Sequence, residues 1–117
     1  MGRFLPLLAL CAAAAACEPA WSVQGHVRAD DGSRSPVAGA LLTLRCPGQR
    51  DATARSDRDG LFELGGAGLG PSLECAVIAT APGRAVAEIG LRDACEDPSD
   101  AAGKCSVAVL EVPLSRR

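Results

Sequence analysis

Residues 40–46, ALLTLRC, and residues 73–80, LECAVIAT, decide the fold of this chain. In both stretches every second residue is apolar or a cysteine, which is the period of a β-strand with one buried face. The residues that share a face are Leu42, Leu44 and Cys46 in the first stretch, and Leu73, Cys75, Val77 and Ala79 in the second. Each strand therefore turns one cysteine toward the core.

The position of these two cysteines predicts how the disulfides form. Beyond residue 17 the chain has four cysteines, Cys46, Cys75, Cys95 and Cys105, which allow three connectivities. Because Cys46 and Cys75 both face the core, we predict that they pair inside the fold. Cys95 and Cys105 bracket a polar loop, and we predict that they close it. The spacings contain no two-residue zinc knuckle, so a zinc site is not expected.

The remaining chain alternates short apolar runs with Gly, Pro and Asp turn signals. No window sustains apolar residues at helical spacing. The expected strands are residues 22–29, 40–46, 52–56, 61–64, 73–80, 85–91 and 105–114. Seven short strands without crossover helices predict an all-β fold, a seven-stranded antiparallel β-sandwich.

The first expected strand shows which side chains face solvent. Val23 and Val27 lie on one face, and Gln24, His26 and Arg28 lie on the other. His26 is the only histidine of the chain, which excludes any mechanism or metal site that needs two. A single imidazole on a strand is usually a surface residue. With no nucleophile–base pair in view, we predict that the chain is not an enzyme and holds no cofactor or metal.

Charge and aromatic content exclude further classes of partner. The 12 Lys and Arg and 14 Asp and Glu of this 117-residue chain give a net charge of −2, without the clustered basic residues that neutralise phosphates. Nucleic acid is therefore not expected as a partner. Aromatic residues are 3% of the chain, and only Trp21 could offer a ring to a sugar.

One loop gathers negative charge. Between residues 92 and 104 the chain carries four carboxylates, those of Asp93, Glu96, Asp97 and Asp100. Calcium takes six to eight oxygen ligands, so this loop is the candidate site for a cation or a cationic partner. The alternative is a solvated loop held by its disulfide.

The N-terminus has the features of an export signal. Arg3 precedes a stretch without charge, residues 4–16, which is shorter than the ~20 residues of a membrane-spanning helix. The stretch ends in Ala14-Ala15-Ala16-Cys17, which resembles the lipobox of bacterial lipoproteins. The resemblance implies a signal peptide over residues 1–16, an acylated Cys17 (for example with palmitate), a tether over residues 17–20 and a domain over residues 21–117. An ordinary secretory signal that leaves Cys17 unmodified is the alternative.

Several short motifs resemble those of a known family. They are Val23-x-Gly25-x-Val27, residues 36–40 (PVAGA), residues 56–62 (SDRDGLF), residues 69–71 (LGP) and residues 81–83 (APG). In this order they resemble the carboxypeptidase regulatory-like domain, over residues 21–91. The resemblance implies a transthyretin-like β-sandwich that serves as a non-catalytic accessory or surface module.

These observations together predict a lipid-anchored protein of the bacterial cell envelope. Glu18 after the lipidated cysteine favours the outer membrane over the inner one. The tether is short enough to hold the domain within about 15 Å of the bilayer. The expected partners are the membrane, through the lipid, and an unknown envelope protein; the alternatives are a carbohydrate-binding-like module, or a secreted disulfide-bonded domain without lipid. Addition of a strand at a sandwich edge is a natural binding mode, but the sequence does not identify the edge.

Overall fold

The computed structural model describes residues 20–99 and 103–117. Its elements, in chain order, are β1 (Ala20–Ala29), β2 (Leu41–Arg45), β3 (Ala52–Arg55), β4 (Leu61–Ala67), β5 (Ala76–Thr80), β6 (Ala87–Gly90), α2 (Leu91–Ala94), β7 (Cys95–Ser99) and β8 (Lys104–Leu114). The prediction of an all-β fold is confirmed. Cys17 lies outside the described residues.

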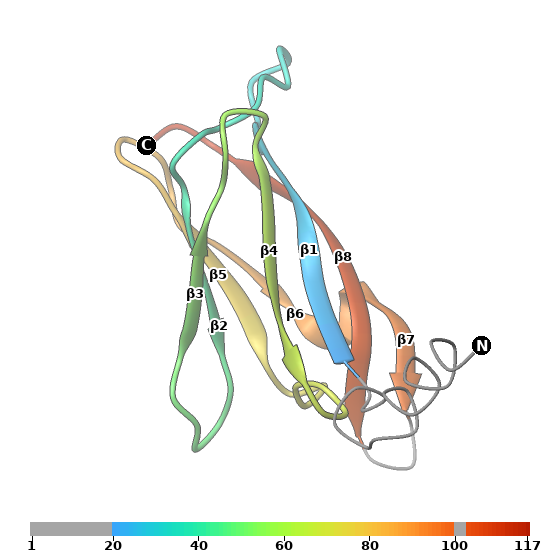
Figure 1. Ribbon diagram of the computed structural model, residues 1–117. Helices are drawn as coiled ribbons and strands as arrows, with labels where there is room; N and C mark the ends of the chain where they lie inside the picture. Colours follow the sequence, from blue (N-terminus) through green and yellow to red (C-terminus); the bar gives the residue numbers. More distant parts are fainter. Residues whose placement is uncertain (1–19, 100–102) are drawn as a thin grey trace, which may run out of the picture.

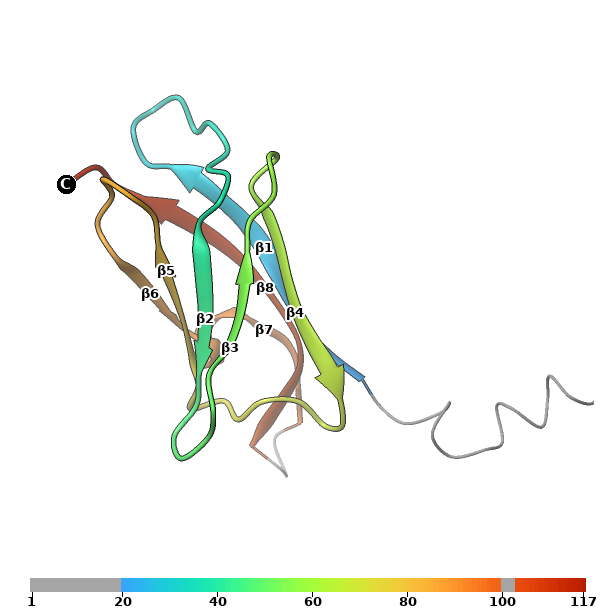
Figure 2. The same cartoon turned by 60° about the vertical axis from the view of Figure 1, so that its left-hand side comes forward.

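The strands form two four-stranded sheets that pack face to face (Figure 1; Figure 2). Sheet A has the order β4-β1-β8-β7, and sheet B has the order β3-β2-β5-β6. The alternation read in the sequence places Leu42 and Val77 of sheet B against Val23 and Leu110 of sheet A, all of them buried. The molecule is therefore a β-sandwich with its core between the sheets.

Two features of the predicted sandwich need correction. The described residues form eight strands instead of seven, and one pair is not antiparallel: β1 runs parallel to β8, with Ser22 opposite Val107 and Ala29 opposite Leu114. The other strand pairs are antiparallel. The first and last long strands thus lie side by side in the middle of sheet A. Short-range turn signals carry no information on a pairing between the two ends of a chain.

The eighth strand arises where a long loop was expected. In place of an irregular segment over residues 92–104, the chain forms the single-turn helix α2 and then β7, which pairs with β8. Leu91 is fully buried, and its backbone N–H donates to the Cys75 carbonyl at 2.9 Å. The buried leucine anchors the start of the segment, and the adjoining disulfide holds its strand beside β8.

Both disulfides have the pairing predicted from the strand faces. Cys46 and Cys75 join the end of β2 to the start of β5, and both are buried. Cys95 and Cys105 join β7 to β8. Each sheet of the sandwich therefore contains one covalent link between neighbouring strands.

The two ends of the sandwich differ in what they carry. The start of β1, the end of β4 and the turn after β2 lie at one end (Figure 1). The loop after β1, the β3–β4 turn and the C-terminus lie at the other end (Figure 1; Figure 2). No helix in the described part of the chain is long and apolar enough to cross a membrane.

Candidate functional site

The outer face of sheet A brings together side chains from three strands. In one row, Leu61 of β4 lies opposite His26 of β1, which lies opposite Glu111 of β8. In the next row, Glu63 of β4 and Val109 of β8 flank Gln24 of β1. Because paired residues of neighbouring strands project to the same side, these six side chains form one surface, which we call the outer face.

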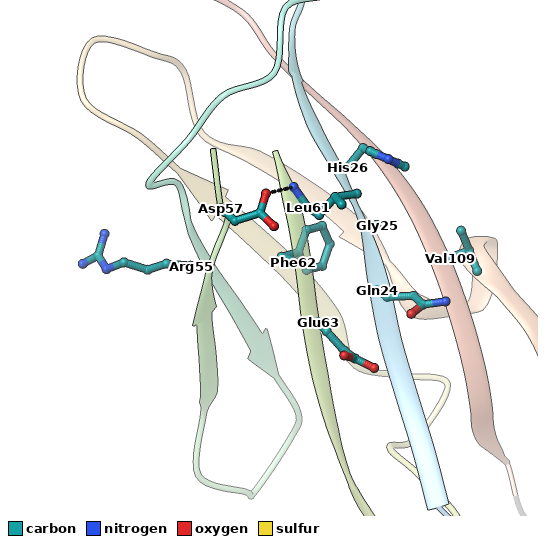
Figure 3. A pocket seen from close by; sticks show the side chains of 9 residues that line it. All are labelled: Gln24, Gly25, His26, Arg55, Asp57, Leu61, Phe62, Glu63 and Val109. Carbon is teal, nitrogen blue, oxygen red and sulfur yellow. Dashed lines mark hydrogen bonds between the residues drawn. The ribbon is translucent and has the colours of Figure 1, made fainter. Parts of the chain in front are cut away.

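A hollow of about 540 Å³ opens on this surface and extends past β4 to Arg55 and Asp57 on the far side of that strand (Figure 3). Its lining comprises Gln24, Gly25, His26, Arg55, Asp57, Leu61, Phe62, Glu63 and Val109. Leu61 is 41% exposed and Val109 is 43% exposed, although both are large apolar residues. Leu61 and Val109 lie on either side of β1 in this hollow, and polar side chains surround them.

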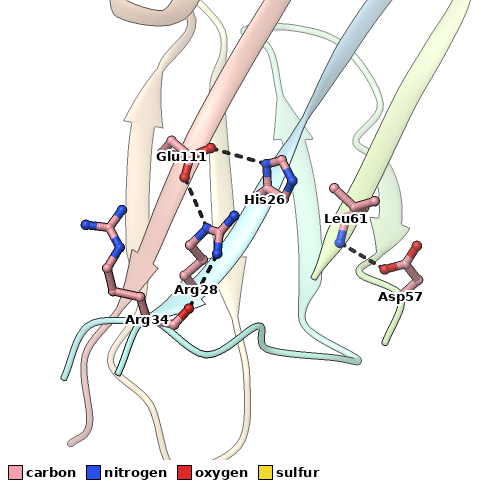
Figure 4. A network of polar contacts seen from close by, with 6 residues as sticks. All are labelled: His26, Arg28, Arg34, Asp57, Leu61 and Glu111. Carbon is pink, nitrogen blue, oxygen red and sulfur yellow. Dashed lines mark hydrogen bonds and ion pairs between the residues drawn. The ribbon is translucent and has the colours of Figure 1, made fainter. Parts of the chain in front are cut away.

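A polar network crosses from β1 to β8 beside the hollow (Figure 4). One carboxylate oxygen of Glu111 lies 3.2 Å from Nδ1 of His26, and the other lies 3.4 Å from Nε of Arg28. All three side chains are open to solvent, so these contacts add little to stability. They bring the imidazole and the guanidinium together around one carboxylate on the outer face.

The turn before β4 positions Leu61. One carboxylate oxygen of Asp57 accepts hydrogen bonds from the backbone N–H of Asp59 at 2.8 Å and of Leu61 at 3.0 Å (Figure 4). The backbone N–H of Asp57 donates in turn to the Leu61 carbonyl at 2.8 Å. Gly60 adopts a φ of +79°, which an L-residue rarely takes. The DRDG sequence therefore sets where β4 begins.

Three of the four carboxylates of the candidate cation site lie in the described part of the chain, and the fourth does not, so the site stays a prediction. Asp93 lies in α2, Glu96 and Asp97 lie in β7, and Asp100 lies outside the described residues. Within residues 20–99 and 103–117, no three His, Cys, Asp or Glu side chains form a group that could hold a metal ion. The pairing of β7 with β8 shifts register on both sides of Asp97.

Trp21 does not form an exposed platform for a sugar. It has the same parity as Val23 on β1 and packs, half-buried, against the core. A side chain at Gly66 would meet its indole ring at 2.9 Å, and one at Gly70 would meet its Cβ at 3.1 Å. The indole ring therefore packs over Gly66, and the Trp21 Cβ lies next to Gly70.

The outer face was only partly visible in the sequence. Parity correctly places Gln24, His26 and Arg28 on one side of the first strand. Glu111 is 85 residues away from His26 along the chain, and the parallel pairing of β1 with β8 makes them neighbours. Leu61 and Val109 are the sequence signal that could have revealed the outer face. Each is an apolar residue at an outward position of a strand whose alternate residues are buried.

Comparison with known proteins gives structural neighbours but no family. No family model matches the sequence, and a search of curated proteins found no match. Among solved structures, the chain resembles 3-chlorocatechol 1,2-dioxygenase from Rhodococcus opacus with a TM-score of 0.60 at 12% identity, covering 86% of this chain and 61% of that one. It resembles chlorocatechol 1,2-dioxygenase from Pseudomonas putida with a TM-score of 0.60 at 13% identity, covering 85% and 61%.

A third neighbour is shorter than these two enzymes. It is the dioxygenase domain of a dioxygenase–carbohydrate-binding protein fusion from Streptomyces sp. SirexAA-E, with a TM-score of 0.54 at 17% identity, covering 86% of this chain and 82% of that domain. The chain spans about three fifths of the length of the first two neighbours. At such identities the likeness is one of fold.

The comparisons correct one prediction. The chain was predicted not to be an enzyme because the sequence shows no nucleophile–base pair. The comparisons contradict this prediction, because the solved structures with a similar sandwich are dioxygenases.

Proposed function

We propose that this chain is a lipid-anchored module of the bacterial cell envelope that binds a protein partner through the outer face of sheet A. The observation that carries the proposal is the outer face itself. It places two exposed apolar side chains, Leu61 and Val109, in one hollow with hydrogen-bonding groups from three strands. A surface of mixed character without an exposed aromatic ring suits a protein partner better than a sugar.

The position of the first strand supports the anchor. β1 begins at Ala20, three residues after Cys17, so an acyl group on that cysteine would hold the start of the sandwich next to a membrane. Two disulfides support export, because such bonds persist outside the cytosol. Glu18 favours the outer membrane as the location.

We also propose that the domain is related to the carboxypeptidase regulatory-like domain and has its transthyretin-like fold. The Asp57 turn supports this relation, since its carboxylate forms the hydrogen bonds that begin β4, where the resembling motif occurs. The two-layer arrangement of short strands is consistent with that fold.

The function is tested by crosslinking in intact cells with two matched valine variants. Val109 is 43% exposed on the outer face, and Val86 is 56% exposed on the connection that precedes β6. In Val109→Asp a charge replaces an apolar side chain in the hollow, so we expect the formaldehyde adduct to an envelope protein to fall at least fivefold. Val86→Asp makes the same change elsewhere and should leave the adduct unchanged. Equal loss in both variants, or no adduct with the wild-type chain, would contradict the proposal.

A further inference from the structure

The free side of β4 carries backbone groups that have no partner among the described residues. β4 ends sheet A, and among the described residues it pairs only with β1. The backbone N–H of Val27 donates to the Gly60 carbonyl at 2.7 Å, which fixes which residues of β4 hydrogen-bond to β1. By the alternation of an antiparallel ladder, Phe62, Leu64 and Gly66 bond to β1, whereas Leu61, Glu63, Gly65 and Ala67 turn their N–H and C=O groups away from it.

The Asp57 turn satisfies only the first of these four residues. Both backbone groups of Leu61 are bonded to Asp57, at 3.0 Å and 2.8 Å. Glu63, Gly65 and Ala67 continue along the same edge beyond the turn. The hollow reaches this side of β4, since Arg55 and Asp57 line it across the strand from Gln24 (Figure 3). Glu63, Gly65 and Ala67 are all exposed, so this edge of β4 is open to solvent at each of the three.

The other sheet edges are protected against pairing. β7 contains Pro98, two register shifts against β8 and a disulfide through Cys95. β3 and β6 have four residues each. β4 has seven residues, with neither a proline nor a lysine, and no register shift against β1. Proline, lysine, bulges and short length are the means by which proteins block edge pairing, and β4 uses none of them.

We propose that β4 accepts an extended segment of the partner protein as an added strand of sheet A. This inference rests on the proposed function and names how that partner binds. A row of alternating N–H and C=O groups at two-residue spacing is matched by another extended backbone. The added strand would hydrogen-bond to Glu63, Gly65 and Ala67.

The side chains of β4 favour a different protein over a second copy of this chain. In an antiparallel pair of two β4 strands, one register places Glu63 opposite Glu63, and like charges directly opposite are destabilising. The adjacent registers place Glu63 opposite Leu61 or Gly65, and the next one places it opposite Ala67. No self-pairing register gives Glu63 a basic partner.

The same side chains define the sequence of the added strand. Glu63 is the only charged residue of β4, so a Lys or Arg fits opposite it. Gly65 lacks a side chain, so a large aromatic or β-branched residue two positions away fits over it. The expected segment thus has a basic residue and a bulky one separated by a single residue.

The probe is a library of random 12-residue peptides, selected on the full mature chain made soluble by Cys17→Ser. We expect enriched peptides to carry the basic–x–bulky pattern in either direction. Absence of enrichment, or enrichment without this pattern, would overturn the proposal.

A matched pair of proline variants tests whether the backbone edge is used. Glu63 turns its backbone N–H away from sheet A, as described above. Glu88 turns its backbone N–H away from sheet B, because the hydrogen bond from the Leu91 N–H to the Cys75 carbonyl fixes the alternation in β6. Proline at either position removes an outward donor and leaves the ladder intact. Glu63→Pro should weaken the dissociation constant of a selected peptide at least tenfold, and Glu88→Pro should change it less than twofold. Thermal unfolding of each variant verifies that it is folded.

A third variant separates the effect of the Glu63 charge from the effect of its backbone N–H. Glu63→Gln keeps the N–H and removes the charge, so it should weaken binding by about threefold, less than Glu63→Pro.

Equal binding of the selected peptide by Glu63→Pro and by the wild-type chain would overturn strand addition. Concentration-dependent dimerisation of the chain that the peptides do not displace would overturn it as well. If the cellular crosslink depends on Val109 but persists in Glu63→Pro, strand addition fails while the proposed function stands. If the wild-type chain gives no crosslink in cells, the proposed function fails, whatever the peptide experiments show.

Discussion

Gly25 is the residue of β1 with the least room for a side chain. It lies between Phe62 of β4 and Leu110 of β8, and a Cβ built on it overlaps the Leu110 carbonyl oxygen. The backbones of β1 and β8 would have to separate to admit a methyl group. The close packing of β1 against β8 therefore depends on this glycine.

We predict that Gly25→Ala lowers the free energy of unfolding by about 3 kcal/mol or more, because the overlap is with backbone and cannot be relieved by rotating a side chain. Urea unfolding with the disulfides intact measures the change. Gly90→Ala is the control, since a Cβ there would lie 3.6 Å from the Asp93 carboxylate, an ordinary contact. Equal losses in the two variants would contradict the account of the β1–β8 contact.

Asp31 is a residue whose acidity the fold changes. The Ser33 hydroxyl and the Ser33 backbone N–H both donate to one carboxylate oxygen, at 2.6 Å and 3.0 Å, and these bonds hold the pKa of Asp31 below its usual value. The positive charges of Arg84 and Arg116 lower the pKa further. The group is fully exposed, so the effect concerns the local loop.

We predict that an NMR titration of the Asp31 carboxyl carbon gives a midpoint below the usual value of about 3.9. A depressed carboxyl pKa means that the contribution to stability is complete above the unfolded-state pKa and disappears as the pH falls through the folded-state pKa. Ser33→Ala should raise the midpoint toward its usual value, and Arg116→Ala should raise it less. A midpoint unaffected by Ser33→Ala would refute the hydrogen-bond cause.

At the scale of elements, the two disulfides link strands over different lengths of chain. Cys46 and Cys75 are 29 residues apart, and Cys95 and Cys105 are 10 residues apart. In the chain-entropy model the longer loop loses more freedom in the unfolded state. The bond between β2 and β5 should therefore stabilise the fold more than the bond between β7 and β8.

We predict that Cys46→Ala/Cys75→Ala costs roughly 4 kcal/mol of unfolding free energy and Cys95→Ala/Cys105→Ala roughly 3 kcal/mol. Denaturant unfolding of the two double variants measures both values. The reverse order would show that native contacts at β7, and not chain entropy, determine the difference.

The elements also show what a sequence can and cannot predict. Alternation over residues 40–46 and 73–80 is local, and it was enough to place the strands, their buried faces and the cysteine pair between them. The pairing of β1 with β8 depends on residues at opposite ends of the chain, so no local pattern contains it. For the same reason β7 was missed, because its polar residues become a strand only where β8 and the disulfide hold them.

For the candidate site too, local patterns predicted the orientation of single residues but not the contacts between distant strands. Parity gave the outward direction of Gln24, His26 and Arg28, which is a property of one strand. The hollow needs the registers of β4, β1 and β8 together, and those registers bring Leu61 and Val109 beside His26. The segment expected to be one acidic loop contains the helix α2 and the strand β7 in its described part, and whether its carboxylates bind a cation stays a prediction.

At the scale of the whole molecule, the sandwich relates its binding surface to its proposed anchor. β1 begins beside the expected anchor and then runs through the centre of sheet A, where it contributes three residues to the hollow. The outer face and the open edge of β4 therefore lie on the sheet that contains β1, the first described strand of the chain (Figure 1). If Cys17 is anchored as proposed, a partner strand added to β4 would lie in the same sheet as the strand that follows the anchor.

The central claim, a module displayed on a membrane by a lipid on Cys17, is tested most directly by the intact mass of the protein purified from envelope membranes. The account predicts a chain that begins at Cys17 and carries a diacylglyceryl group. Cys17→Ser should abolish the modification and release the protein from the membrane fraction, whereas Cys11→Ser, within the signal peptide, should leave the mature mass unchanged. An unmodified chain in the soluble fraction, beginning at Cys17 or at any other residue, would contradict the claim.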